Sequence, residues 1–207
     1  MRLAIFDLDN TLLAGDSDFL WGRHLVEQGC VDGEQYDRQN RAFYEQYLAG
    51  TLDIHEFHRF SLAPLAAHPL PQLHAWRAQF VREKIEPIVA ALAPALLEKH
   101  RALGDTLLIM TATNHFVTEP IAQLLGVDVL IATDPEFLDG RYTGRIAGTP
   151  NFREGKVTRL EQWMREQGIT TADISFYSDS HNDLPLLLRA DRAIAVDPDD
   201  RLRAEAQ

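Results

Sequence analysis

The order of strand-like and helix-like segments constrains this fold more than any other sequence feature. Residues 3–8 form a short apolar run that ends in carboxylates, which is typical of a buried parallel strand. Between residues 17 and 85 the apolar residues recur at helical spacing in roughly four segments, and no strand pattern interrupts them. Strands and helices then alternate, with strands expected at 106–110, 127–132, 174–177 and 193–196 and a hairpin at 137–146.

This order predicts an α/β fold with a doubly wound parallel sheet, because strands that alternate with helices pair in parallel. The first strand joins the same sheet as the later ones, so the helical block is an insert. We predict an α/β core of residues 1–15 and 86–207 and a small helical domain of residues 16–85. A length of 207 residues suits this arrangement.

Composition and charge exclude several classes of protein. The net charge is −11, with 31 acidic residues against 20 basic ones and no basic stripe, which argues against a nucleic-acid partner. No apolar run is long enough to span a membrane, and the N-terminal run stops at Asp7, too early for a signal peptide. Cys30 is the single cysteine, so no intrachain disulfide can form. We expect a cytoplasmic protein without a membrane partner.

Polar side chains follow the strands where a ligand site is expected. In open α/β sheets ligands bind at the carboxyl ends of the strands. The residues expected to meet there are Asp7, Asp9, Thr111, Asp179 and Asp183, with Lys156 at the start of a helix. Carboxylates this close repel each other by roughly 4 kcal/mol per pair at about 4 Å, so they stay ionised together only around a cation. Oxygen donors without a His or Cys cluster favour Mg²⁺.

The spacing of the first two carboxylates suggests a reaction. Residues two apart in an extended segment point to the same side, so Asp7 and Asp9 face one ligand. One carboxylate can attack phosphorus while the other protonates the leaving oxygen. A metal and Lys156 would relieve the repulsion between the nucleophile and the phosphate dianion.

These segments resemble the motifs of the haloacid dehalogenase (HAD) superfamily, in the family's order. Residues 6–12, Phe-Asp-Leu-Asp-Asn-Thr-Leu, resemble its first motif and imply Asp7 as nucleophile and Asp9 as acid/base. The second and third motifs imply Thr111 as the phosphate-binding hydroxyl and Lys156 as the catalytic lysine. The resemblance covers most of the chain and implies a Rossmann-like core with a helical cap after strand one.

The fourth motif implies the metal site and the branch of the superfamily. The resemblance implies Mg²⁺ held by Asp7, by the main-chain carbonyl of Asp9 and by Asp179, with Asp183 as a supporting carboxylate. Asn182 resembles the phosphate-contacting asparagine of the phosphoserine phosphatase branch, subfamily IB. Members of this branch usually continue for another strand, and the resemblance leaves open whether a C-terminal tail follows Gln207.

Each of these residues alone has an ordinary structural explanation. An Asp at a strand end is commonly a turn or helix cap, and Lys156 alone fits a solvated first-turn lysine. Four matches in order make the catalytic interpretation the stronger one. A receiver domain that carries phosphate on Asp is disfavoured, because its acceptor lies on a middle strand and it lacks a cap. A mutase or phosphotransferase of the same fold remains an alternative, whereas a pumping ATPase would have Thr in place of Asp9.

The substrate prediction depends on two residues. Asp16 falls where the phosphoserine phosphatase branch has a Glu that binds the substrate ammonium, and it fits a helix N-cap equally well. Arg59 resembles the branch's carboxylate-binding arginine, but a solvated helical arginine is the slightly favoured interpretation. The resemblance implies a phosphomonoesterase for a small phosphorylated metabolite. Phosphoserine is the first candidate and histidinol phosphate the alternative, with a monomer or homodimer as the assembly.

Other residues attract weaker interpretations. His55 and His58 fall short of a zinc-binding spacing and are expected on the surface of a helix. The aromatic stripe of Tyr36, Phe43, Tyr44 and Tyr47 is expected in the core of the helical domain rather than around a ligand.

Overall fold

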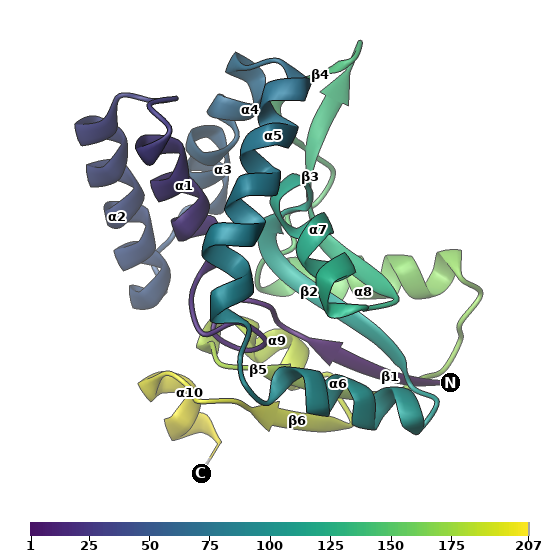
Figure 1. Cartoon of the computed structure of the whole chain (residues 1–207). Coiled ribbons are helices and arrows are strands. Elements are labelled where there is room, and N and C mark those ends of the chain that lie inside the picture. Colours follow the sequence, from purple (N-terminus) through teal and green to yellow (C-terminus); the bar gives the residue numbers. More distant parts are fainter. Residues whose placement is uncertain (207) are drawn as a thin grey trace.

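The computed structural model describes residues 1–206. A sheet with strand order β4-β3-β2-β1-β5-β6 forms the centre (Figure 1). Strand β1 (Arg2–Phe6) pairs in parallel with β2 (Thr106–Asn114) and β5 (Asp173–Ser178). Strands β3 (Val129–Leu138) and β6 (Arg192–Ala195) extend the parallel sheet, and β4 (Arg141–Ala147) is antiparallel to β3. The predicted α/β class and the mostly parallel sheet are confirmed.

The central strand is buried on both faces, as its apolar run predicts. Ala4 and Phe6 belong to one hydrophobic cluster with helices α6 (Ala93–Ala102) and α7 (His115–Leu125). Leu3 and Ile5 point the other way, into a cluster with α8 (Glu154–Glu166), α9 (Leu184–Leu187) and α10 (Asp200–Glu205). Successive side chains of the strand therefore point into two hydrophobic layers, one on each face of the sheet. These two layers are the physical basis of the doubly wound arrangement.

The helical insert consists of five helices rather than about four. They are α1 (Ser17–Glu27), α2 (Gly33–Ala49), α3 (Ile54–Ser61), α4 (Ala63–Ala67) and α5 (Leu70–Phe80). The third predicted helix divides at Leu62 because Pro64 has no N–H for a bond to the preceding turn. A π-helical turn η1 (Val81–Ile85) and a 3₁₀ turn η2 (Glu86–Ile88) lead back to α6.

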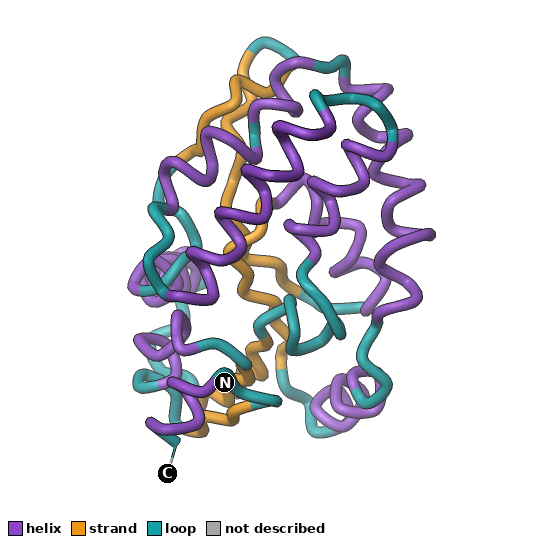
Figure 2. Tube along the Cα trace, turned by 90° about the vertical axis from the view of Figure 1, so that its left-hand side faces the viewer, coloured by secondary structure: helices purple, strands orange, loops and turns teal. Residues whose placement is uncertain are grey.

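The insert packs on the sheet through a shared hydrophobic cluster. Trp21 of α1 contacts Phe80 of α5 and Phe116 of α7, with ring centroids 5.2 and 6.0 Å away. The same cluster contains Phe6 of the central strand, so insert and core are continuous in their packing. Helices α3 and α4 lie along the β3–β4 hairpin (Figures 1 and 2). This packing holds the start of α1 close to the end of β1.

Two strands are longer than their sequence patterns indicate. Strand β2 was expected to end at residue 110 but continues to Asn114, after a register shift in its pairing with β3. Strand β3 runs without a break into the hairpin, because the antiparallel pairing with β4 begins at Asp134. Residues 111–114, which follow the predicted strand, therefore lie in the strand itself. Among residues 1–206, no helix combines the length and the apolar character needed to cross a membrane.

Candidate active site

One pocket lies where the carboxyl ends of β1 and β2 face the insert. Two groups of residues line it. The reaction end carries the polar core residues Asp7, Asp9, Thr111, Thr113, Lys156 and Asp183. The insert end carries Asp16, Asp18, Phe19, Asn40, Phe43, Tyr44, Tyr47, Leu52, Ile54 and Phe57. The structure thus brings Asp7, Asp9, Thr111, Lys156 and Asp183 to one pocket, whose described lining does not include Asp179 or Asn182.

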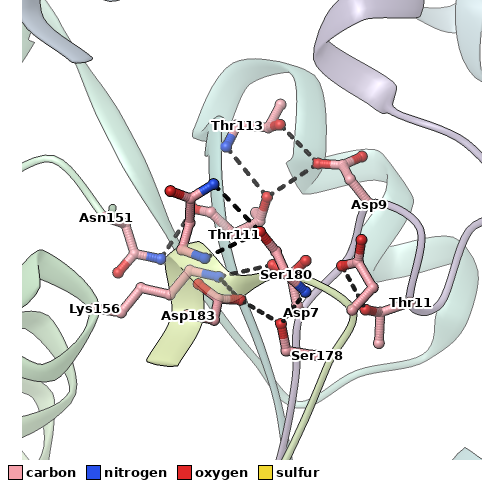
Figure 3. A network of polar contacts seen from close by, with 12 residues as sticks. Asp7, Asp9, Thr11, Thr111, Thr113, Asn151, Lys156, Ser178, Ser180 and Asp183 are labelled. Carbon is pink, nitrogen blue, oxygen red and sulfur yellow. Dashed lines mark hydrogen bonds and ion pairs between the residues drawn. The ribbon is translucent and has the colours of Figure 1, made fainter. Parts of the chain in front are cut away.

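Lys156 joins two buried carboxylates at the reaction end (Figure 3). Its Nζ donates to Oδ1 of Asp7 at 2.8 Å and to Oδ2 of Asp183 at 2.7 Å. The three residues are only 4%, 2% and 3% exposed for Asp7, Lys156 and Asp183. Ser178 Oγ donates a further bond of 2.8 Å to Asp183. Buried charges are stable only when paired and hydrogen-bonded, and here each has partners.

Burial and the neighbouring charges shift the pKa of Asp7 in opposite directions. Burial raises the pKa of Asp7, Lys156 lowers it, and Asp183, Asp179 and Asp9 raise it again. Burial alone would lower the pKa of Lys156, but Asp183 and Asp7 raise it above its ordinary value. Lys156 therefore stays protonated at neutral pH, and one cation faces several carboxylates.

Local backbone geometry places Lys156. A Cβ on Gly155 would lie 2.1 Å from the carbonyl oxygen of Pro150, so only glycine allows the tight turn that starts α8. Asn151, fully buried, donates from Nδ2 to the carbonyls of Thr111 and Ile131 at 2.9 and 2.8 Å. This amide ties the loop before α8 to the ends of β2 and β3. No sequence pattern indicated this role of Asn151.

Asp9 is held by several donors at the pocket wall. Ser17 N donates to Oδ1 at 2.6 Å, and the hydroxyls of Thr113 and Thr111 donate to Oδ2 at 2.9 and 3.4 Å. Burial raises the pKa of Asp9, although the bonds from Ser17 and Thr113 oppose the rise. A carboxyl group that keeps its proton more readily than usual suits a general acid. Thr113 was not predicted from the sequence.

The donor atoms at the reaction end suit a hard cation, but the side chains do not surround one point. Thr11 Oγ1 donates to Asp179 at 3.2 Å, and burial followed by Asp183 raises the pKa of Asp179 to about 7. A cation would relieve this mutual repulsion. Within residues 1–206, however, no three His, Cys, Asp or Glu side chains are arranged to hold a metal ion as they stand. Magnesium binding by Asp7, Asp9, Asp179 and Asp183 stays a prediction.

Asp16 combines both of its predicted roles. Its Oδ1 accepts from Phe19 N at 2.8 Å, which makes it the N-cap of α1. The residue also lines the pocket, where burial first and Asp9 second raise its pKa to about 7. Asp18, two residues on, lines the same pocket and was not predicted.

Arg59 does not reach the pocket. Its side chain is 66% exposed on α3 and lies 4.0 Å from Glu56 of the same helix. The favoured interpretation of a solvated helical arginine fits this position, and the resemblance to a carboxylate-binding arginine does not. His58, expected on the surface, is instead 2% exposed, and burial lowers its pKa to about 4. Helical spacing could not show that α3 packs against the hairpin on this side.

Asn182 is occupied by contacts to protein groups. Its Oδ1 accepts from Nε and Nη2 of Arg153 at 3.2 and 3.1 Å, and its Nδ2 donates to the carbonyl of Tyr47 at 3.2 Å. Arg153 Nη2 also donates to the carbonyl of Gly50 at 2.6 Å. These bonds join the core to the end of α2. Arg153 was missed, and its left-handed φ of 50° leaves no signal in the sequence.

The aromatic stripe on α2 packs in a hydrophobic cluster, as expected, and also lines the pocket. Phe43 is a buried member of that cluster and Tyr47 packs against it, while Phe43, Tyr44 and Tyr47 all line the pocket. Phe43 also packs against Phe57 with ring centroids 5.5 Å apart. The stripe is therefore both packing surface and pocket wall, because the cavity lies against the buried face of α2.

Comparisons with known proteins identify the family of the chain. The family model "haloacid dehalogenase-like hydrolase" matches residues 4–188. A relative named histidinol-phosphatase from Neisseria meningitidis is 44% identical over 210 residues, which covers 100% of this chain and 95% of the relative. A phosphoserine phosphatase of Mycobacterium tuberculosis is 29% identical, covering 99% and 67%.

Solved structures show the same fold. A Bordetella pertussis protein of unknown function superposes with a TM-score of 0.94 at 47% identity, covering 100% of this chain and 94% of that one. A phosphoserine phosphatase captured as a phospho-aspartyl intermediate analogue gives a TM-score of 0.73 at 18% identity, covering 99% and 90%. The chain is thus a phosphatase and belongs to the haloacid dehalogenase-like hydrolase family.

Proposed function

We propose that the protein is a magnesium-dependent phosphomonoesterase that forms an aspartyl-phosphate on Asp7. The observation that carries the proposal is the buried Asp7–Lys156–Asp183 bridge at the base of the pocket. It presents a carboxylate with a permanent positive charge beside it, as attack on a phosphate dianion requires. The insert of residues 16–85 serves as the cap that encloses a small substrate.

The reaction proceeds in two steps. A carboxylate oxygen of Asp7 attacks phosphorus, the ester P–O bond breaks, and Asp9 gives its proton to the leaving alcohol oxygen. Asp9 then takes a proton from water as the water oxygen attacks the aspartyl-phosphate. The bond between phosphorus and Asp7 breaks, phosphate leaves, and the Asp7 carboxylate is restored. The raised pKa of Asp9 and its firm hydrogen bonding support this double role.

Other residues bind and stabilise the reacting group. Lys156 neutralises charge on the phosphoryl oxygens, and the Thr111 hydroxyl at the end of β2 binds one of them. Mg²⁺, held by Asp7, Asp179 and the main-chain carbonyl of Asp9, would supply additional positive charge for the phosphoryl group. Asp183 supports this site through Lys156 and Ser178. Asn182 supports the site indirectly rather than by contact with phosphate, because Arg153 and the carbonyl of Tyr47 already bond to its amide.

The charges of the pocket favour histidinol phosphate over phosphoserine, the first candidate from the sequence. Five carboxylates line the pocket, and among its described lining residues Lys156 is the only cation. A leaving group with its own carboxylate would meet repulsion there, and Arg59 is too exposed to help. The histidinol-phosphatase relative at 44% identity supports the same choice.

The nucleophile is tested by Asp7→Asn. The variant should lose at least about 1,000-fold in kcat, because an amide of nearly the same shape is a poor nucleophile. Phosphate release is measured on histidinol phosphate, phosphoserine and p-nitrophenyl phosphate, with circular dichroism to confirm the fold. Asp139→Asn, on the exposed hairpin tip where φ is 51°, is the matched control and should keep wild-type rates. A near wild-type rate in Asp7→Asn refutes the covalent mechanism. A preference of the wild-type enzyme for phosphoserine over histidinol phosphate refutes the proposed substrate.

A further inference from the structure

Asp18 is a carboxylate in the pocket for which the mechanism has no use. It lies in the first turn of α1, where an acidic residue ordinarily faces water and stabilises the helix dipole. Here it lines the pocket instead. Its carboxylate has no hydrogen-bond or ion-pair partner among residues 1–206, and its neighbours of like charge are Asp16 and Asp9. A partly buried carboxylate without a partner is costly when it is ionised, so an occupant of the pocket that carries a positive charge or an N–H donor would stabilise it.

Asp16 and Asp18 flank a residue that is bonded to Asp9. Ser17 N donates to Oδ1 of Asp9 at 2.6 Å, with Asp16 before it as the N-cap of α1 and Asp18 after it in the first turn. Asp16 and Asp9 both raise the pKa of Asp18, as like charges close to it do. A substrate that complements these carboxylates carries an ammonium group and a second nitrogen group that donates a hydrogen bond.

Aromatic side chains of the insert line the same pocket as Asp18. They are those of Phe19, Phe43, Tyr44 and Phe57. Asn40 lies among them, 4% exposed, with its Nδ2 donating to the carbonyl of Phe19 at 3.0 Å. Its Oδ1 accepts no hydrogen bond within the described residues, so it is free to accept one from a ligand. The surroundings suit a planar ring that carries N–H donors.

The position of Asn40 depends on one glycine. A Cβ on Gly22 of α1 would lie 2.6 Å from the Asn40 amide nitrogen, closer than packing allows. The absence of that atom lets α1 and α2 approach until Asn40 reaches the pocket. The polar group at this end of the pocket is therefore built into the helix packing.

We propose that Asp18 is a specificity residue that binds the ring nitrogen of an imidazole-bearing amino alcohol phosphate, while Asp16 binds its ammonium group. The inference rests on the proposed function, which it extends from the reacting phosphate to the far end of the substrate. In such a substrate the ammonium lies two carbons from the ester oxygen and the ring lies beyond it. These two groups match Asp16 and Asp18, with Asn40 as a second acceptor for the ring.

The test compares Asp18→Asn with wild type on three esters. Histidinol phosphate has ammonium and ring, 2-aminoethyl phosphate has the ammonium alone, and p-nitrophenyl phosphate has neither. The variant should lose at least about tenfold in kcat/KM on histidinol phosphate, mainly through KM, and stay within about twofold on the other two. Asp16→Asn should instead lose kcat/KM on both substrates that carry an ammonium group, histidinol phosphate and 2-aminoethyl phosphate. Glu45→Gln, an exposed residue of α2, controls for the change in net charge.

The outcomes separate this inference from the proposed function. Equal losses on all three esters, or no loss on any, overturn the role of Asp18 while wild-type turnover of histidinol phosphate still supports the proposed function. If wild type fails to hydrolyse histidinol phosphate but hydrolyses p-nitrophenyl phosphate, the substrate proposal fails, and the inference fails with it. A thermal unfolding curve for Asp18→Asn excludes loss of fold as the cause of a loss of activity.

Discussion

The two ends of the pocket differ in how their charges are balanced. At the reaction end, Lys156 bridges Asp7 and Asp183, and hydroxyl groups of threonine and serine complete the hydrogen bonding. At the insert end, Asp16 and Asp18 face the same space with no cation beside them. At the reaction end one protein cation pairs with two of the carboxylates and the proposed Mg²⁺ balances the others, whereas at the insert end the described lining supplies no cation and the balance comes from a positively charged ligand.

This difference separates reaction from recognition. The reaction end can treat any phosphate ester alike, because its groups address the phosphoryl oxygens and the leaving oxygen. Discrimination between substrates must then come from the insert end. An unpaired carboxylate there destabilises the empty pocket and binds a cationic leaving group favourably. Carboxylate-bearing substrates meet like charges there, so the same residues select and reject.

Removal of the metal should have the largest effect on this comparison. In excess EDTA the activity should fall at least about 1,000-fold on every ester, charged or neutral, because the loss falls on the reaction end. Added Mg²⁺ should restore it. Phosphate release from histidinol phosphate and p-nitrophenyl phosphate is the measurement. Full activity in excess EDTA contradicts the proposed metal dependence.

Asp16→Ala should have the next largest effect, at the insert end. Removing one partner of a buried ion pair costs about 3–5 kcal/mol, so kcat/KM should fall at least about 100-fold on histidinol phosphate. On p-nitrophenyl phosphate, which has no ammonium, the loss should be below about tenfold. Arg59→Ala is the matched control from the outer face of the insert and should change kcat/KM less than about twofold. Equal losses on both esters in Asp16→Ala mean that the residue only caps α1.

The reaction end was largely predictable from the sequence. Its residues follow strands, and the carboxyl ends of parallel strands meet at one edge, so Asp7, Thr111 and Asp183 had to approach one another. The α/β order of segments likewise specified the sheet and its two layers. Helix α1 began where Asp16 could cap it, which local capping chemistry explains.

The insert end was much less predictable. Helical spacing identifies the buried face of α2, and Phe43 does belong to a hydrophobic cluster, but the spacing cannot show that the same face also lines a cavity. The same ambiguity hid the burial of His58. Arg153 was missed because its function depends on a left-handed backbone and on partners distant in sequence. Contacts between helices of the insert are tertiary facts that no local pattern encodes.

The smallest expected effect concerns stability, and it tests the imbalance at Asp18 without any substrate. Burial and Asp16 raise the pKa of Asp18 well above its ordinary value, so the folded state binds this proton more tightly than the unfolded state does. The cost to folding is absent below the unfolded pKa of about 3.9 and grows as the pH rises towards the folded pKa. Asp18→Asn removes that cost, so it should raise Tm by about 3 °C or more at pH 8 and by less at pH 5.

Thermal unfolding followed by circular dichroism at both pH values measures this gain, with Glu45→Gln expected to change Tm little at either. Histidinol, the alcohol product, sharpens the comparison. Because a ligand stabilises the folded state in proportion to its affinity, millimolar histidinol should raise the Tm of wild type more than that of Asp18→Asn. Asp18→Asn would then have the higher Tm without ligand, and histidinol would raise its Tm by less than that of wild type. A gain independent of pH, or equal stabilisation of both proteins by histidinol, would mean that Asp18 is balanced by the protein itself and that the contrast between the two ends is wrong.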